Sequence, residues 1–134
     1  MNLPNEFLLF NLFVVGGVCV EFVILNPSYF KTGHWRRRYH FSMFRYVFLL
    51  LFPSIGLFIL MKHIGVSIVG GIFLLSCIAG TILEWCIGCS YHAIVGQRLW
   101  TYHRSSLAGY TSLLSIPLWG LGGVYLWLLF QILS

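Results

Sequence analysis

The stretch SIVGGIFLLSCIAGTILEWCI, residues Ser67–Ile87, decides the structural class of this protein. An α-helix needs about 20 largely apolar residues to cross the hydrocarbon core of a bilayer. This stretch has that length, and Glu84 is its only charged residue. The sequence therefore predicts a transmembrane helix here.

Three further stretches have the same character, namely Phe7–Leu25, Met43–Met61 and Tyr110–Leu133. The four together predict an all-α integral membrane protein with four transmembrane helices, in a single membrane domain over residues 1–134. Pro53 and Pro117 fall inside the second and fourth predicted helices. Proline is tolerated in a transmembrane helix and usually kinks it, so kinks are expected at both positions.

The composition of the whole chain agrees with this class. Of its 134 residues, 59% are hydrophobic and 8% are charged, whereas a soluble domain carries about a quarter charged residues. This small number of charged side chains cannot cover a surface that faces water. We therefore expect lipid to surround most of the chain. Residues Met1–Glu6 lack the basic region of a signal peptide, and we expect the first apolar stretch to be retained as a helix.

The basic residues predict how the chain is oriented in the membrane. Those of the first and third loops are Lys31, Arg36, Arg37, Arg38, Arg98 and Arg104. The positive-inside rule places these loops in the cytoplasm, and hence both termini on the non-cytoplasmic side of a cell or inner membrane. Because the basic residues lie between apolar runs, the net charge of +5 favours anionic lipid head groups over nucleic acid as a partner. Arg36, Arg37 and Arg38 are candidates for head-group contacts.

The sequence matches itself at an offset of about 63 residues. The matched pairs are Gly17 and Gly80, Glu21 and Glu84, Tyr39-His40 and Tyr102-His103, and, after one insertion, Pro53 and Pro117. This pattern predicts two tandem two-helix units, about residues 7–62 and 67–134. Two helices return the chain to the same side, so the units are expected to be parallel repeats related by an axis along the membrane normal. Glu21 and Glu84 would then face each other at equal depth.

These two carboxylates are the main candidates for a binding site. Both are predicted about one helical turn from the cytoplasmic ends of their helices, and an ionisable group inside a membrane suggests a function. The residues expected to surround them in a polar chamber are Tyr39, His40, Tyr102, His103, Arg98 and Arg104. Such a chamber could bind a cation, relay protons or hold a lipid head group. Alternatively, each Glu anchors the two units by pairing with Arg45, Arg104 or a tyrosine hydroxyl.

A ridge of small and polar residues recurs at every fourth position of the third predicted helix. Its members are Ser76, Gly80, Glu84, Gly88 and His92, and such a ridge suits close helix packing. Cys86, Cys89 and His92 are of types that bind zinc. A continuous helix spreads them around its axis, however, and no fourth ligand is evident. Neither a metal, a cofactor, a catalytic residue nor a disulfide framework is predicted.

The second half of the chain carries a recognisable set of motifs. They are Gly80-x-x-x-Glu84, Arg98-Leu99-Trp100-Thr101-Tyr102, Gly109-Tyr110-Thr111-Ser112 and Pro117-Leu118-Trp119-Gly120. Over residues 76–125 the chain resembles the ABC-transporter permease-like (CmpB) family of small integral membrane proteins. That resemblance implies a transport-related function without implying a substrate. Thr101 stands where the family has Asp, so the resemblance assigns no proton-carrying carboxylate to this loop.

These observations favour a transporter-like or accessory membrane subunit with a polar site near the cytoplasmic face. The expected partners are membrane lipids and either further copies of the chain, as a homo-oligomer, or other subunits of a membrane complex. One alternative is a structural scaffold subunit of a larger complex. Another is a membrane-embedded enzyme for a lipid or isoprenoid substrate, as in small lycopene-cyclase subunits, although their Pro-x-Glu-Glu signature is absent at Pro117. The enzyme hypothesis predicts an apolar cavity that reaches from the bilayer to Glu21 and Glu84.

Overall fold

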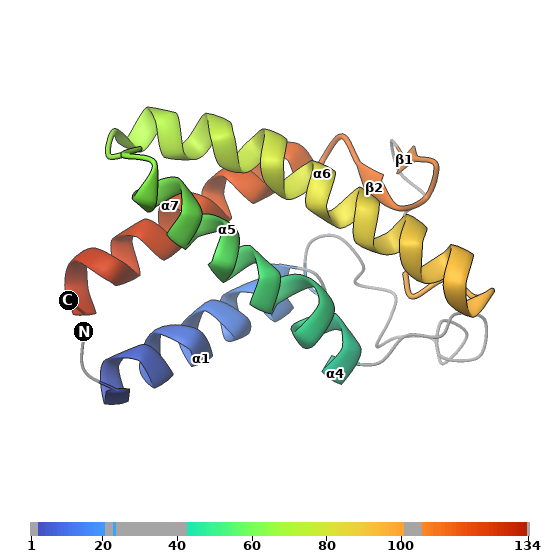
Figure 1. Ribbon diagram of the computed structural model, residues 1–134, viewed down its shortest axis with the longest axis horizontal. Helices are drawn as coiled ribbons and strands as arrows, with labels where there is room; N and C mark the ends of the chain where they lie inside the picture. The colour runs from blue at the N-terminus through green and yellow to red at the C-terminus, as the bar shows by residue number, and fades with distance from the viewer. Residues whose placement is uncertain (1–2, 21–22, 24–42, 101–105, 134) are drawn as a thin grey trace.

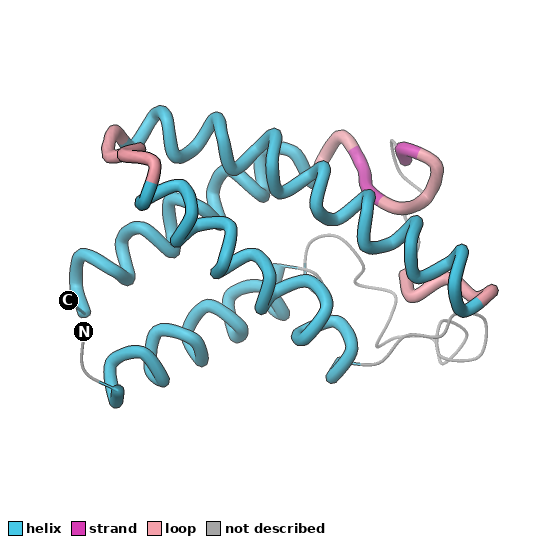
Figure 2. The backbone as a smooth tube through the Cα atoms, in the orientation of Figure 1, coloured by secondary structure: helices cyan, strands magenta, loops and turns pink. Residues whose placement is uncertain are grey.

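The computed structural model describes residues 3–20, 23, 43–100 and 106–133, most of which are helical. The helices are α1 (Leu3–Cys19), α4 (Met43–Tyr46), η2 (Val47–Leu51), α5 (Phe52–His63), α6 (Val69–Val95) and α7 (Ser115–Leu133). Of these, α4, the π-helical η2 and α5 follow one another without a break (Figures 1 and 2). A short antiparallel hairpin, β1 (Ser106–Leu107) and β2 (Thr111–Ser112), joins α6 to α7. The predicted all-α class is confirmed.

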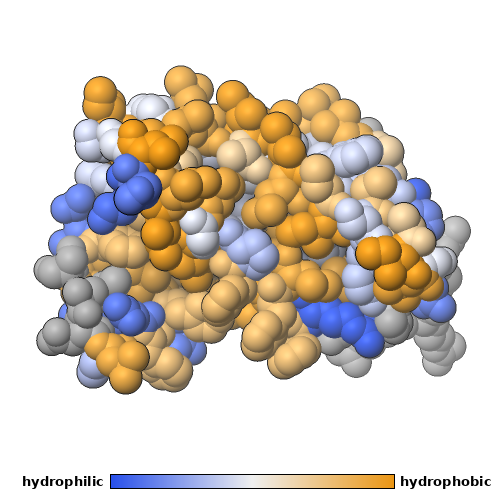
Figure 3. All heavy atoms as spheres, viewed as in Figure 1, coloured by the Kyte–Doolittle hydropathy of each residue, from blue (hydrophilic) through white to orange (hydrophobic). Residues whose placement is uncertain are grey.

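Among the described residues, three helical segments are long and apolar enough to cross a membrane, namely Phe44–His63, Val69–Val95 and Ser115–Leu133. Helix α1 is also apolar but shorter. Large apolar side chains cover much of the visible surface (Figure 3), and many are widely exposed, as Leu74, Ile78 and Ile82 are along α6. A monomer dissolved in water rarely exposes so large an apolar surface. The structure is therefore consistent with an integral membrane protein.

The third predicted span ends later than the sequence suggests. Helix α6 continues past Ile87 to Val95, and Gly96 ends it in the left-handed conformation with φ 79°, as glycine commonly does. The apolar run stops near Ile87, but polar residues such as Ser90 and His92 still form helical hydrogen bonds. Glu84 therefore lies about three turns from the end of its helix, and the predicted distance of one turn is wrong.

The fourth predicted span begins later, at Ser115 instead of Tyr110. Residues 106–112 form the hairpin, whose turn has positive φ at Ala108 and Gly109. The Ser112 hydroxyl accepts a hydrogen bond from the Ser115 N–H (3.2 Å) and so caps the first turn of α7. Pro117 falls in that first turn, where its missing N–H removes no helical hydrogen bond, so no kink is required there.

Pro53 has a different setting from its predicted counterpart Pro117. It lies inside the continuous helical segment of residues 43–63, directly after the π-helical turn η2. A proline inside a helix leaves a carbonyl without its usual donor, and a π-helical turn is one way to accommodate the change. The two halves therefore differ at their best-matched prolines, and the repeat and the four-span count remain predictions.

Helices α6 and α7 pack closely because glycines line their contact. The buried face of α6 contains Ser76, Gly80, Glu84 and Gly88. The predicted packing ridge is therefore confirmed for these four of its five residues. A Cβ atom on Gly80 would lie 2.5 Å from Cδ2 of Trp119. On α7, a Cβ atom on Gly120 would lie 2.5 Å from the Sγ of a buried α6 cysteine. Glycine at these positions is what lets the two backbones approach.

Helix α1 joins the first half of the chain to the second. The Asn5 side chain donates a hydrogen bond to the Leu133 carbonyl (2.7 Å), and the Tyr125 hydroxyl donates one to the Leu12 carbonyl (2.9 Å). The start of α1 and the end of α7 therefore lie side by side (Figure 1). At its other end α1 packs Gly17 against Leu51 of η2.

Candidate functional site

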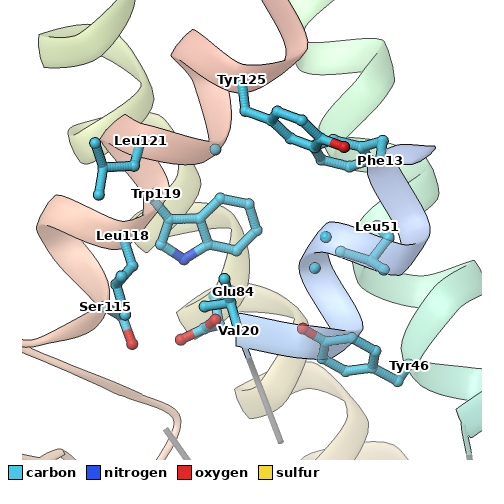
Figure 4. Close-up of a pocket in the computed structure, with 13 residues that line it drawn as sticks. Phe13, Val20, Tyr46, Leu51, Glu84, Ser115, Leu118, Trp119, Leu121 and Tyr125 are labelled. Carbon is cyan, nitrogen blue, oxygen red and sulfur yellow. The ribbon is translucent and has the colours of Figure 1, made fainter. Parts of the chain in front are cut away.

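A cavity of about 350 Å³ lies between the two halves of the chain (Figure 4). Helix α1 contributes Phe13, Gly16 and Gly17 to its wall, and α7 contributes residues between Ser115 and Tyr125. The first half also supplies Tyr46 and Leu51, and α6 supplies Glu84. Four separate helical segments thus surround one space at the seam between the halves.

Glycines on both sides help to create the space. Gly16 and Gly17 place no side chain between α1 and the cavity at their positions, and Gly122 places none on α7. A Cβ atom on Gly16 would lie 2.8 Å from Cε1 of Tyr125, so that ring closes down directly on the α1 backbone. A Cβ atom on Gly122 would meet nothing within 4 Å. Gly122 therefore borders open space.

Aromatic rings form much of the cavity wall. Phe13 and Tyr125 stand together at one side, and Trp119 lies between them and Glu84 in the view of Figure 4. The Tyr125 hydroxyl is already bonded to α1, so its ring offers the cavity an apolar surface. Tyr46 is held by an edge-on contact with Trp100, with ring centroids 6.2 Å apart. The wall is therefore mainly apolar.

The polar end of the cavity is the Glu84 carboxyl group. The side chain is only 2% exposed and lines the cavity from α6. Burying a carboxyl group away from water is costly, and in a membrane such a group marks a functional site by default. Next to it, the Ser115 hydroxyl is 3.0 Å from the Ser112 hydroxyl and is hydrogen-bonded to it. Glu84 is thus placed to contact whatever occupies the cavity.

The cavity also reaches the outside of the helix bundle. Leu121 lines it and is 57% exposed, so this side chain stands at its rim. Leu121 lies on a helix long and apolar enough to span a membrane. The rim of the cavity therefore includes a side chain of a helix that is long and apolar enough to span a membrane.

Only two of the residues predicted to form the polar chamber are among the described residues. Glu84 lines the cavity, but Arg98 does not. The Arg98 guanidinium donates a hydrogen bond to the Ala108 carbonyl (2.9 Å) and lies 4.7 Å from the centroid of the Tyr110 ring. The predicted residues outside the described part of the chain are Glu21, Tyr39, His40, Tyr102, His103, Arg104, Arg36, Arg37 and Arg38.

The Tyr110 cluster fastens the hairpin to the end of α6. The Tyr110 hydroxyl is hydrogen-bonded to Nδ1 of His92 (2.7 Å), and its carbonyl accepts a hydrogen bond from the Trp100 indole (2.8 Å). His92 is thereby engaged with the hairpin, while Cys86 is exposed elsewhere on the same helix. Among the described residues, no three His, Cys, Asp or Glu side chains gather closely enough to hold a metal ion.

The spacing of residues along α7 indicates which face of the helix lines the cavity, although hydropathy alone does not reveal it. Ser115, Trp119, Gly122 and Tyr125 follow one another at steps of three or four residues, and Leu118 adjoins Trp119, which places them on one side of a helix; all of them line the cavity. In so apolar a helix this face does not stand out from its neighbours. Which residues lie opposite this face of α7 across the cavity is determined by tertiary packing.

Comparisons of this chain with protein-family models, with characterised proteins and with solved structures found no match. The resemblance to the CmpB family remains a prediction.

Proposed function

We propose that this chain is a transporter-like or accessory membrane subunit that binds an apolar molecule from the lipid phase. The observation that carries the proposal is an apolar cavity that opens beside Leu121 and ends at the buried Glu84. Small-molecule sites are mostly apolar hollows of about 300–1,000 Å³ with a few polar groups that orient the ligand. This cavity of about 350 Å³ has that form at the small end of the range.

The proposal includes the finer topology, with α1 as a fourth span and two parallel two-helix repeats. The hydrogen bond between Asn5 and Leu133 supports it, because it brings both ends of the helical bundle to one side. An even number of spans likewise places both ends of the chain on the same side of the membrane. The basic first and third loops then face the cytoplasm, and the termini face the opposite side. A glycosylation acceptor appended at either terminus should be modified, whereas one inserted in the third loop should not.

A cavity-filling substitution tests the binding proposal. Gly122→Leu places a side chain in open space within the cavity, while Gly56→Leu places one on α5 where a Cβ atom also meets nothing within 4 Å. Both change a helical glycine to leucine, so the second is a matched control. The probe is a small apolar aryl diazirine, photolysed with the chain in lipid nanodiscs, and labelled peptides are read by mass spectrometry.

We expect saturable labelling of the cavity-lining segments of α1 and α7 in the natural chain and in Gly56→Leu. Gly122→Leu should lose the saturable part and keep the diffuse labelling of lipid-facing side chains. Equal saturable labelling in all three proteins would contradict the proposal, because the cavity would then not be the binding site.

A membrane-embedded enzyme for a lipid or isoprenoid substrate is the second candidate. One observation favours it: the cavity reaches Glu84, as that hypothesis predicts for one of its two carboxylates, while Glu21 lies outside the described residues. An enzyme would convert its ligand over time into a product that differs in mass or in chromatographic retention, and Glu84→Gln would stop that conversion by removing the acid or base. Recovery of an unaltered ligand after prolonged incubation would favour binding alone.

A further inference from the structure

A cationic side chain is held in position where the hairpin packs on the end of α6. The Arg98 guanidinium lies 4.7 Å from the centroid of the Tyr110 ring, and its Nη1 atom donates a hydrogen bond to the Ala108 carbonyl (2.9 Å). The Tyr110 ring is fixed in turn, because its hydroxyl is hydrogen-bonded to His92 and Trp85 makes a T-shaped contact with it at 5.5 Å between centroids. Arg98 therefore has little side-chain freedom left to lose when it binds a ligand.

Most N–H groups of this guanidinium are not used by the protein. Within the described part of the chain, the Ala108 carbonyl is the one acceptor that the structure gives to Arg98. The N–H groups of Nη2 and Nε form a fork that matches two oxygens of a carboxylate or phosphate group. The side chain is also partly exposed. An anion from outside the protein can therefore reach this fork.

The carboxyl groups of the described residues lie elsewhere in the molecule. The chain has three Asp and Glu residues in all, and Glu21 lies outside the described residues. Glu6 is in the first turn of α1, whose start lies beside the end of α7. Glu84 is buried and lines the cavity, which Arg98 does not. The described structure therefore surrounds Arg98 with a carbonyl and aromatic rings, and with no negative charge.

The length of α6 places this cation at the level of the lipid head groups. The hydrocarbon core of a bilayer is about 30 Å thick, a distance that about 20 helical residues cover. Counted from Val69, the first residue of α6, this distance ends near Cys89. His92 and the hairpin residues packed on it then lie just outside the core, in the region of the lipid phosphates. The proposed topology assigns this end of α6 to the cytoplasmic leaflet, which carries anionic lipids.

One face of α6 leads from this cluster into the hydrocarbon core. Ile78, Ile82 and Trp85 follow one another at steps of four and three residues, which places them on one face, and all three are exposed. His92 lies about two turns beyond Trp85 on the same face. From the expected edge of the core to Ile78 the helix covers about 16 Å, about half the core thickness and so the depth of one leaflet. A lipid acyl chain can lie along this face.

We propose that the end of α6 binds an anionic phospholipid, whose phosphate accepts hydrogen bonds from Arg98 and whose acyl chain lies along Ile82 and Ile78. The charge of the site selects the lipid class. A zwitterionic head group would bring its own cation beside Arg98, where the described residues offer no carboxylate to receive it. Phosphatidylglycerol carries the same phosphate without that cation. This site is separate from the cavity and does not rest on the proposed function.

The test compares two photoactivatable lipids with the full chain in phosphatidylcholine nanodiscs. The probes are phosphatidylglycerol and phosphatidylcholine with the same diazirine-bearing acyl chain, each in trace amount. Mass spectrometry reads the labelled peptides on α6 and, as a reference for bulk lipid, around the exposed Leu128 and Ile132 of α7. We expect the phosphatidylglycerol probe to label the exposed face of α6 about fivefold more, the factor for one basic residue near an anionic lipid surface. Both probes should label the α7 reference equally.

Arg98→Gln removes the charge and keeps a polar side chain. It should reduce the preference on α6 to less than about twofold, because the electrostatic contribution of one basic residue is lost. Lys62→Gln is the matched control, because Lys62 is also a cation over an aromatic ring, 4.5 Å from the centroid of Phe130. Lys62 lies at the end of α5, shortly before α6 begins, and hence at the opposite end of α6 from Arg98. The preference should persist in this variant.

A measurement on the natural chain needs no substitution. Raising the ionic strength from about 0.05 M to about 0.5 M should lower the preference on α6, because salt screens the attraction between partly exposed charges. Equal labelling of α6 by the two probes at low salt would overturn the proposal. A preference that survives both high salt and Arg98→Gln would do so as well.

Further competitors distinguish a lipid from a soluble phosphate compound. Inorganic phosphate and glycerol 3-phosphate are added to the buffer at millimolar concentration. Both should leave the labelling of α6 unchanged, because neither has an acyl chain to lie along the helix. Loss of the preference in their presence would assign Arg98 to a soluble phosphate compound and overturn the lipid proposal. Cavity binding is read on the cavity-lining segments of α1 and α7, so the two proposals fail separately.

Discussion

Two adjacent glycines of α7 provide a direct test of how the helices pack. A Cβ atom on Gly123 would overlap the Ser76 Oγ atom of α6 and lie 2.5 Å from its Cβ atom. A Cβ atom on Gly122 would meet nothing within 4 Å. The variants Gly123→Ala and Gly122→Ala therefore make the same chemical change one residue apart, and only the first meets a neighbour.

The size of the difference follows from the geometry. Replacing glycine by alanine inside a helix gains about 1 kcal/mol in both variants, so this term cancels when they are compared. Ser76 has a short side chain on the buried face of α6, so the overlap cannot be relieved by a flexible side-chain tip. The helices must move apart, and such overpacking costs about 1–3 kcal/mol. We expect Gly123→Ala to be less stable than Gly122→Ala by that amount.

The free energy of unfolding can be measured by reversible titration of the micelle-bound protein with sodium dodecyl sulfate, followed by circular dichroism. Adding Ser76→Gly to Gly123→Ala removes the atoms that collide and should recover most of the loss, which a double-mutant cycle reports as a coupling energy. Equal stability of the two single variants, or a zero coupling energy, would refute the close approach of α6 and α7.

Three further substitutions test separate parts of the fold. Tyr125→Phe removes the cross-helix hydrogen bond to α1 and should lower the free energy of unfolding by about 0.5–1.5 kcal/mol in the same titration. Tyr110→Phe removes the hydrogen bond to His92, so amide exchange measured by mass spectrometry should rise in the hairpin and stay unchanged in α7; a uniform rise would contradict a local role. Gly96→Ala forces a side chain at φ 79° and should cost about 1–2 kcal/mol, whereas Gly56→Ala, with no neighbour within 4 Å, should be neutral or stabilising.

The helical segments could be predicted because bilayer thickness sets a length that hydropathy reveals. The packing face of α6 was predictable for a similar reason, since Ser76, Gly80, Glu84 and Gly88 repeat with the helical period and are all buried. Helix ends were harder, because they depend on local hydrogen bonds. Gly96 ends α6 through its left-handed backbone, and the Ser112 hydroxyl caps the first turn of α7.

The later end of α6 explains why Arg98, one of the residues expected around Glu84, does not line the cavity. With a helix ending at Ile87, Arg98 would return through a loop close to Glu84. The helix instead runs on to Val95, which carries the chain about 16 Å along the axis from Glu84 at 1.5 Å per residue. Arg98 then packs on the hairpin at Tyr110. The Glu84 carboxyl group was noticed from the sequence because carboxyl groups are rare in this chain, whereas the position of Arg98 depends on where α6 ends.

The two faces of α7 connect helix packing with the chemistry of the site. One face carries Gly120 and Gly123 against α6, and the other turns Trp119, Gly122 and Tyr125 toward the cavity. Because the helix is nearly rigid, the close approach on the first face sets the position of the second.

Gly80 of α6 affects both faces of α7. It allows the two helices to approach each other, and the Trp119 ring packs on it. Its predicted counterpart, Gly17, packs instead on the aliphatic Leu51. In each half, then, a glycine of the first helix receives a side chain from the second helix of the same half. Only in the second half does that side chain carry an N–H donor. If the halves are repeats, they therefore differ chemically at this contact, because an indole packs on Gly80 where an aliphatic side chain packs on Gly17.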